Sequence, residues 1–137
     1  MGIVRRIPGF GKIMMPALVA LEVDDIHRLS HPGKLCAYAG LVPSTYASGG
    51  KVYHGRLLPT CNRWLRWAYV EAAQIAQRTS PYCHAYLERS KRRKGANSAN
   101  TALGRRLCEI SWHCLSGNRP FEKRTSTCMG RLCPVAF

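Results

Sequence analysis

The chain has 137 residues and a formal net charge of +14, from 21 lysines and arginines against 7 aspartates and glutamates. This length suits one domain with a single core, and the charge favours polyanionic partners, above all nucleic acid. No apolar run approaches the roughly 18 residues of a membrane-spanning helix, and no secretory leader is visible, so we expect a cytoplasmic protein without a membrane partner.

The seven cysteines are odd in number and form no Cys-x-x-Cys motif. We therefore expect reduced, mostly buried thiols rather than a disulfide framework. Cys83–His84 and His113–Cys114 leave a zinc site as an alternative, but their spacing fits no common zinc motif. We predict no metal site in this chain.

The first motif is Ile-Pro-Gly-Phe-Gly at Ile7–Gly11, followed by Lys12. In a helix-hairpin-helix module, Gly9 and Gly11 would let backbone N–H groups approach a phosphate, and Lys12 would add a cation. A plain glycine-rich loop is the equal alternative. A proline in the next segment would kink a helix there, so we expect a regular helix only from about Met15 to Val23.

Asp24–Asp25 are adjacent and do not face each other on a helix, which argues against a catalytic pair. We predict instead that they cap a short turn around Ile26–Leu29. Ser30–Pro32 predicts the start of a helix over Gly33–Ala39 that ends at Gly40. The expected packing surface of this helix is Leu35, Cys36, Tyr38 and Ala39.

Tyr38–Arg56 is the most informative stretch, because after Pro43 it brings hydroxyls, two glycines and cations together. Gly49 and Gly50 can adopt positive φ, so the chain can turn sharply directly after Ser48. A hydroxyl on such a turn, facing cations, suits attack on a phosphate, whose transition state gathers negative charge. The hydroxyls are Ser44, Thr45, Tyr46 and Ser48, and the cations that follow are Lys51, His54 and Arg56.

The same stretch also fits an ordinary β-hairpin, with Thr45–Ala47 paired to Lys51–Tyr53. The local pattern alone favours this alternative. Both interpretations predict a hairpin that turns at Ser48–Lys51, and they differ in whether Ser48 is a nucleophile.

Thr60 is expected to cap a long helix that runs to about Gln77. Arg63 and Arg66 lie on its first turn, so base stacking by the neighbouring tryptophans is one interpretation. Tryptophans beside an alanine stripe are more often part of the core, and we favour that interpretation. The predicted buried stripe is Leu65, Ala68, Ala72 and Ala76, widened by Trp64, Trp67 and Ile75.

Ser80–Pro81 predicts the cap and first turn of a helix to about Arg92. Its periodic positions are Tyr82, Ala85, Tyr86 and Arg89. Four consecutive cations follow at Lys91, Arg92, Arg93 and Lys94. A solvated helix end is one interpretation, but without an interleaved acid we favour phosphate contact.

Asn97 or Ser98 is expected to cap a last long helix that runs to about Leu115. Gly117 then occupies the place of a left-handed C-cap, and Pro120 prevents continuation. The predicted buried positions are Ala99, Ala102, Leu103, Leu107, Ile110 and Cys114.

Helical periodicity fails from Glu122 onward. We therefore predict one domain over residues 1–121 and a poorly ordered basic tail over residues 122–137. The expected fold class is mainly α, with a helix-hairpin-helix-like N-terminal segment, one short β-hairpin and then three packed helices.

Ala37–Pro43, followed by Ser48–Lys51, closely resembles the C-terminal domain of DEDD-type bacterial insertion-sequence transposases, which are related to Piv-type DNA invertases. The resemblance covers roughly residues 7–121 in the right order, which makes it more specific than any one motif. The other matching segments are Ile7–Gly11, Asn62–Arg66, Ser80–Tyr82 and Gly117–Phe121.

The resemblance implies that the serine of the Ser-Gly pair, here Ser48, is a nucleophile on DNA. Gly49 and Gly50 would shape its turn, and Lys51 and His54 would support the charged transition state. The expected nucleic-acid contacts are Gly9, Gly11, Lys12, Arg56, Arg63, Arg66, Lys91, Arg92, Arg93 and Lys94.

The resemblance also implies an N-terminal RNase-H-like domain whose four acidic residues bind divalent metal. No set of the seven acidic residues here has that spacing, so we expect no cofactor in this chain and Mg²⁺ in the absent domain. His54 is the only nearby candidate base, and we expect no activity from this chain alone.

DNA is the expected partner, with a structured guide RNA and a homo-oligomer on DNA as further implications of the resemblance. The alternative function is a stand-alone basic module that binds DNA or RNA without chemistry.

Overall fold

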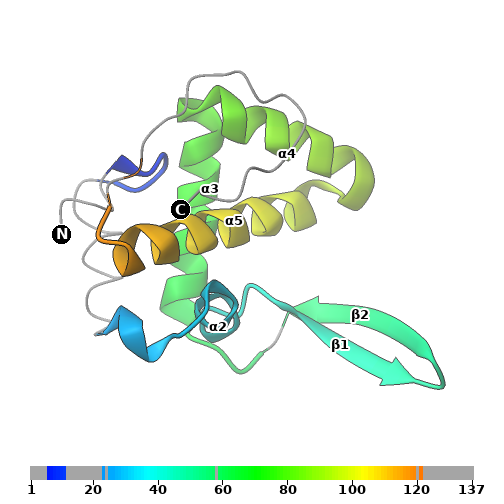
Figure 1. Cartoon of the computed structure of the whole chain (residues 1–137). Helices are drawn as coiled ribbons and strands as arrows, with labels where there is room; N and C mark the ends of the chain where they lie inside the picture. Colours follow the sequence, from blue (N-terminus) through cyan, green and yellow to red (C-terminus); the bar gives the residue numbers. More distant parts are fainter. Residues whose placement is uncertain (1–5, 12–22, 24, 58, 120, 122–137) are drawn as a thin grey trace.

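The computed structural model describes residues 6–11, 23, 25–57, 59–119 and 121. Over these residues the fold is mainly α with one two-stranded antiparallel sheet, as predicted (Figure 1). None of the described helices is long and apolar enough to cross a bilayer. The elements are a short 3-10 helix η2 (Ile26–Arg28), α2 (Pro32–Tyr38), β1 (Pro43–Ser48), β2 (Lys51–Leu57), α3 (Arg63–Thr79), α4 (Pro81–Lys94) and α5 (Ala96–Ser116).

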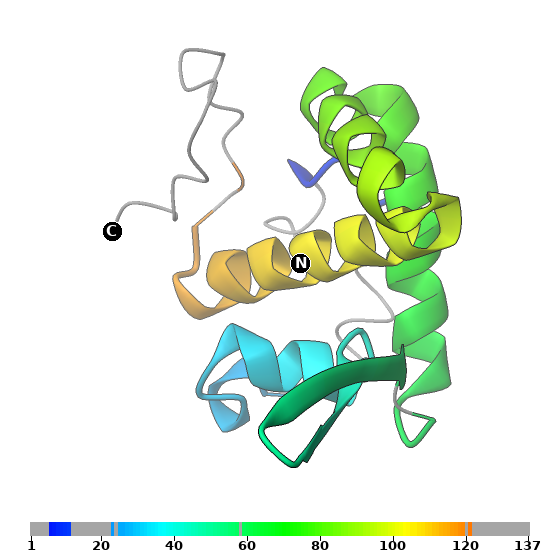
Figure 2. The same cartoon turned by 90° about the vertical axis from the view of Figure 1, so that its right-hand side faces the viewer.

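Helix α5 crosses the middle of the molecule, between α4 above it and α2 below it in Figure 1. Helices α2, α3 and α4 all pack against α5, and α3 also packs against α4. The three predicted packed helices are therefore confirmed, and α2 joins them through α5. The β1–β2 hairpin projects away from this helical body (Figures 1 and 2).

The alanine stripe of α3 lies at the centre of the core. Ala68, Ala72 and Ala76 are buried as predicted, because small side chains let neighbouring backbones approach closely. Gly104 of α5 uses that space, since a Cβ there would lie only 3.2 Å from the carbonyl oxygen of Tyr69. The α3–α5 contact therefore depends on small residues from both helices.

A short series of hydrogen bonds crosses the contact between α3 and α5. The fully buried Tyr69 hydroxyl lies 2.7 Å from Ser111 Oγ, which itself donates to the carbonyl oxygen of Cys108 at 2.8 Å. The serine proton is thus used, so the tyrosine is the donor to Ser111. These hydrogen bonds satisfy the buried hydroxyl groups of Tyr69 and Ser111, which would otherwise destabilise the core.

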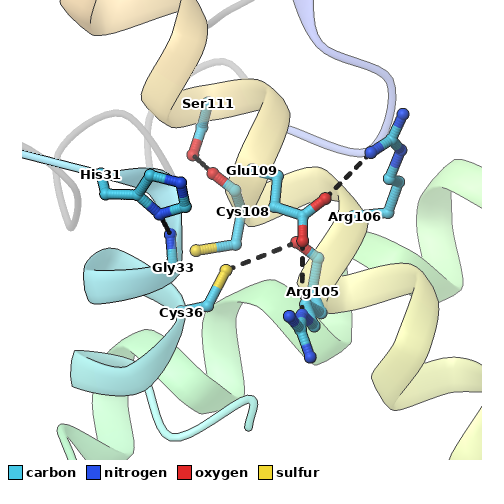
Figure 3. A network of polar contacts seen from close by, with 8 residues as sticks. All are labelled: His31, Gly33, Cys36, Arg105, Arg106, Cys108, Glu109 and Ser111. Atoms are coloured by element: carbon cyan, nitrogen blue, oxygen red, sulfur yellow. Dashed lines mark hydrogen bonds and ion pairs between the residues drawn. The ribbon is translucent and has the colours of Figure 1, made fainter. Parts of the chain in front are cut away.

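Cysteines form much of the contact between α2 and α5. Figure 3 shows Cys36 of α2 facing Cys108 of α5, with Cys36 Sγ donating to the carbonyl oxygen of Arg105 at 3.9 Å. Burial raises the pKa of the Cys108 thiol, which therefore stays protonated. Among the described cysteines, Cys36, Cys83, Cys108 and Cys114 are buried, as predicted, and Cys61 is half-buried.

Surface ion pairs flank this contact on α5. The Glu109 carboxylate accepts from Arg106 at 2.9 Å and from Arg105 at 3.3 Å (Figure 3). Both pairs join residues three or four apart on one helix, the spacing that places side chains side by side.

The predicted start of α2 at Ser30–Pro32 is confirmed, whereas the predicted cap of α3 was wrong. The cap of α2 is His31, whose Nδ1 accepts from the N–H of Gly33 at 3.0 Å. The cap of α3 is Asn62 rather than Thr60, because the Asn62 amide oxygen accepts from the N–H groups of Trp64 and Leu65 at 3.0 and 3.1 Å. The helix start consequently moves to Arg63, whereas the capping of the short turn at Ile26 by Asp25 is confirmed.

Ser80 is the N-cap residue of α4 and is followed by Pro81, as predicted, although its side chain makes no cap bond. The caps of α5 differ from the predictions. Gly95, at φ +82°, joins the two helices by itself, so neither Asn97 nor Ser98 is a cap. After α5 the left-handed residue is Asn118 at φ +48°, and Gly117 stays at φ −86°.

Five large side chains that were predicted on packing faces lie exposed instead. On a helix with 100° per residue, Trp67 falls roughly half a turn away from the buried centre of α3. On α4 the core side is formed by Cys83 and Leu87, with Tyr86 partly buried, one position away from the predicted face. The five exposed side chains are Tyr38, Trp64, Trp67, Ile75 and Tyr82.

Some predictions concern residues outside the described ranges. These are Lys12, the helix Met15–Val23 except Val23 itself, Asp24, Pro120, and the tail over residues 122–137. The domain boundary at residue 121 stays a prediction.

The turn at Ile7–Gly11 packs against α3. Ile7 and Phe10 are buried, and the Phe10 ring lies 5.9 Å from the Tyr69 ring. Gly9 has φ +86°, and a Cβ there would overlap the carbonyl oxygen of Ala72. Packing therefore accounts for Gly9, whereas Gly11 is exposed with open space around it.

Gly9→Ala is expected to lower the free energy of unfolding by about 2 kcal/mol or more, because it combines a left-handed backbone with a steric overlap. Gly11→Ala is the matched control and should stay within about 0.5 kcal/mol of the wild type. Urea denaturation followed by circular dichroism measures both. Equal stability of the two variants would contradict this packing of Gly9.

Candidate functional site

The hairpin turns where the sequence predicts. Ser48 pairs with Lys51, and the two residues between them, Gly49 and Gly50, have φ of +58° and +76°. A two-residue hairpin turn with both central residues at positive φ matches the twist of the strands and favours glycine at each position. This geometry places Ser48 at the last position of β1, directly before the turn.

Ser48 and Lys51 are both exposed at the tip of the projecting hairpin (Figures 1 and 2). The described residues contain no group of three or more His, Cys, Asp or Glu side chains that could hold a metal ion. Cys83–His84 and His113–Cys114 therefore do not form the zinc site considered from the sequence. The Ser48 hydroxyl is accessible to a large ligand rather than enclosed in a pocket.

The strand register separates His54 from Ser48. His54 pairs with Thr45, and the alternation of a strand puts position 54 on the face of the hairpin opposite to position 48. The predicted assistance of His54 to Ser48 is therefore not favoured by the backbone. The side chains of His54 and Arg56 lie outside what the structure describes, although both residues belong to β2.

The two predicted arginines on the first turn of α3 differ in their surroundings. Arg63 is exposed, whereas Arg66 is half-buried with its guanidinium over Gly40. Gly40 has φ +65°, and a Cβ there would overlap both Arg66 and Cys61. Arg66 thus packs at the base of the hairpin, and Arg63 is the better placed of the two for a ligand.

The cationic cluster Lys91–Lys94 forms the last turn of α4. Arg92 and Arg93 are exposed, but Lys91 Nζ lies 2.8 Å from the Glu88 carboxylate, one turn earlier. This hydrogen bond lowers the pKa of Glu88. The cluster therefore has an acidic neighbour that the unbroken run of cations did not reveal, and the Lys94 side chain is not described.

Figures 1 and 2 show that the hairpin and the turn between α4 and α5 lie on the same side of the molecule. The candidate residues thus gather in two groups on that side: Ser48 and Lys51 at the hairpin tip, and Arg92 and Arg93 at the end of α4. Gly9 is apart from both groups, within the core contact with α3.

A further feature is a hollow on the outer face of α3, formed by tryptophans that the sequence pattern predicted to lie in the core. It has a volume of about 490 Å³ and is lined by Arg63, Trp64 and Trp67. The exposure of Trp67 could have been predicted from the sequence, because at 100° per residue Trp67 lies on the side of the helix opposite the alanine stripe.

Comparison with known proteins gives one family. Residues 1–88 match the family model described as "Transposase IS116/IS110/IS902 family". The chain is 30% identical over 130 residues to the 42 kDa protein of insertion element IS900 from Mycobacterium paratuberculosis, which covers 91% of this chain and 32% of that protein.

Two further relatives agree. The transposase for insertion sequence element IS1111A of Coxiella burnetii is 29% identical over 127 residues, 87% of this chain and 34% of the relative. The pilin gene-inverting protein of Moraxella lacunata is 28% identical over 121 residues, 86% of this chain and 37% of the relative. The chain thus spans about a third of the length of these relatives.

Proposed function

Because the chain belongs to the IS116/IS110/IS902 family of transposases, we propose that it is a DNA-binding part of a transposase that cuts and rejoins DNA, with Ser48 as its nucleophile. The residues that match the family include the whole hairpin. Since the chain spans about a third of its relatives, the proposal gives it a share of the activity rather than the whole.

The observation that carries the proposal is the position of Ser48. A phosphodiester in a duplex is part of a broad surface, and a nucleophile on an exposed, projecting element can reach it. The Gly49–Gly50 turn presents Ser48 at the tip of an exposed hairpin. Lys51, directly opposite in the register, can offset the negative charge that develops on the attacked phosphate.

In the proposed step, Ser48 Oγ attacks phosphorus and forms an Oγ–P bond while one P–O bond to deoxyribose breaks. The electron pair leaves with the sugar oxygen, which takes a proton, and the serine proton passes to a base. Attack by a free sugar hydroxyl on the serine–DNA bond then reverses the step, so a strand is rejoined without an external energy source.

The strand register does not favour the predicted base for this step, and the described residues hold no cluster that could bind a metal. The described residues contain no metal-binding group of three acidic, His or Cys side chains, and position 54 is on the face of the hairpin opposite to position 48. They therefore do not fit the Mg²⁺ site that the family implies, and the step above uses none. We propose that base and metal ligands come from another domain.

The proposal extends to the partners of the complete protein. A structured guide RNA and a homo-oligomer on DNA fit a transposase, as does a cytoplasmic location with access to the chromosome. The second candidate is a basic module that binds DNA or RNA without chemistry. It is favoured by the strand register, which puts position 54 on the face opposite to position 48, and by the lack of a metal-binding cluster among the described residues. A covalent protein–DNA product separates the two.

If roughly five cations contact phosphates, the logarithm of duplex affinity should fall against that of salt concentration with a slope near −4 to −5. Changing Arg92 and Arg93 together to Ala should make the slope shallower by about 2, because each lost phosphate contact contributes about 0.9. Fluorescence anisotropy over a salt series measures the slope.

The matched control is the pair Lys34→Ala and Arg78→Ala, which removes the same charge from exposed positions on α2 and α3. The control should change the slope by less than half as much. Equal effects of the two pairs would show that net charge, rather than the end of α4, determines binding.

Ser48→Ala should abolish the covalent protein–DNA product when the chain is joined to an acidic domain of the family and supplied with Mg²⁺ and guide RNA. Folding should be preserved, because one exposed hydroxyl contributes at most about 1 kcal/mol. A denaturing gel of labelled DNA detects the product. The chain alone is expected to give no cleavage.

Tyr46→Phe is the comparison variant, because a tyrosine hydroxyl in the same strand could form a similar bond to DNA. Its product should equal that of the wild type. A product that persists in Ser48→Ala and disappears in Tyr46→Phe would assign the nucleophile to Tyr46.

A further inference from the structure

We propose that the hollow lined by Arg63, Trp64 and Trp67 binds an unpaired nucleobase of DNA by stacking. The inference rests on the proposed function, since it concerns how this chain holds DNA, and it adds a site for a base to the phosphate contacts described above.

The two indoles form one surface. Trp64 and Trp67 are three residues apart on α3, the spacing that makes side chains neighbours on a helix. They are 66% and 46% exposed, and the hollow beside them has a volume of about 490 Å³.

The third tryptophan, Trp112, has a structural role and differs from Trp64 and Trp67 in its surroundings. Trp112 packs against the core, and its Nε1 donates to the carbonyl oxygen of Leu29 at 2.7 Å. Trp64 and Trp67 lie instead on the side of α3 that its buried alanine face leaves free. Large exposed aromatic surface gathered at one place marks an interaction site.

Charge and size favour a base over an apolar protein surface. Arg63 lines the hollow, and guanidinium and indole planes are the groups on which bases stack. A stable protein contact needs about 800 Å² from each partner, which three side chains do not supply. The net charge of +14 also draws polyanions to the chain.

The hollow begins at the base of the hairpin. Asn62, the cap of α3, donates from its N–H to the carbonyl oxygen of Tyr38 at 3.0 Å and from its side chain to the Tyr38 hydroxyl at 3.4 Å. These bonds tie the first turn of α3 to the end of α2, just before β1. A base held by Trp64 and Trp67 would therefore anchor DNA beside the hairpin that bears Ser48.

The test uses the 137-residue chain and two DNA duplexes that differ by one unpaired 2-aminopurine. Stacking on an indole should quench the fluorescence of that base, and the bulged duplex should bind more tightly than the paired one. Trp64→Ala and Trp67→Ala should each weaken binding of the bulged duplex roughly 5- to 100-fold and remove the quenching, with little effect on the paired duplex.

Two controls accompany these variants. Trp64→Phe and Trp67→Phe keep a ring and should recover much of the quenching. Tyr82→Ala removes an equally exposed aromatic ring, 59% exposed, from α4 and should change nothing. Thermal unfolding should be similar for all variants, because each substituted side chain is exposed.

The outcomes are distinct. Equal binding of both duplexes, unaffected by the alanine variants, would overturn the stacking site and leave the proposed function standing. Loss of binding to both duplexes to the same extent in Trp64→Ala would also overturn it, as would self-association of the chain that disappears in that variant. No binding of the wild type to either duplex would overturn the proposed function as well.

Discussion

The close approach of two segments to the small-residue face of α3 determines the arrangement of the other elements. Gly9 lies against Ala72 from one side, and Gly104 of α5 lies against the backbone at Tyr69. Neither position has room for a larger side chain without movement of the helix backbone. With α5 held in this way, α2 and α4 dock on its remaining surface.

The two faces of α3 therefore have different roles. The alanine face and Tyr69 are buried against other elements, whereas the opposite face, with Trp64 and Trp67, is exposed and accessible to a ligand. The first turn of α3 is also tied to the end of α2 through Asn62, and the hairpin connects these two ends. The helical body thus supports the hairpin without enclosing it.

Burial is consistent with the proposal that Ser48, rather than one of the buried thiols, is the nucleophile. A cysteine thiolate attacks more readily than a serine hydroxyl, but burial raises the pKa of Cys83, Cys108 and Cys114. These thiols are protonated and inaccessible. Ser48 is exposed at the end of β1, outside the core, so the proposed loss of its hydroxyl should have little effect on stability.

The sequence by itself determined the features that depend on neighbouring residues. The Gly49–Gly50 turn, the alanine stripe of α3 and the helical content follow from local backbone preference and periodicity, and the order of motifs identified the family. Tertiary structure decided the rest. Trp67 is exposed because the elements that pack on α3, namely α4, α5 and the Ile7–Gly11 turn, leave its face uncovered, and Gly9 is needed for packing because Ala72 lies against it. Such contacts join residues far apart in the chain, and no local pattern encodes which surfaces will meet.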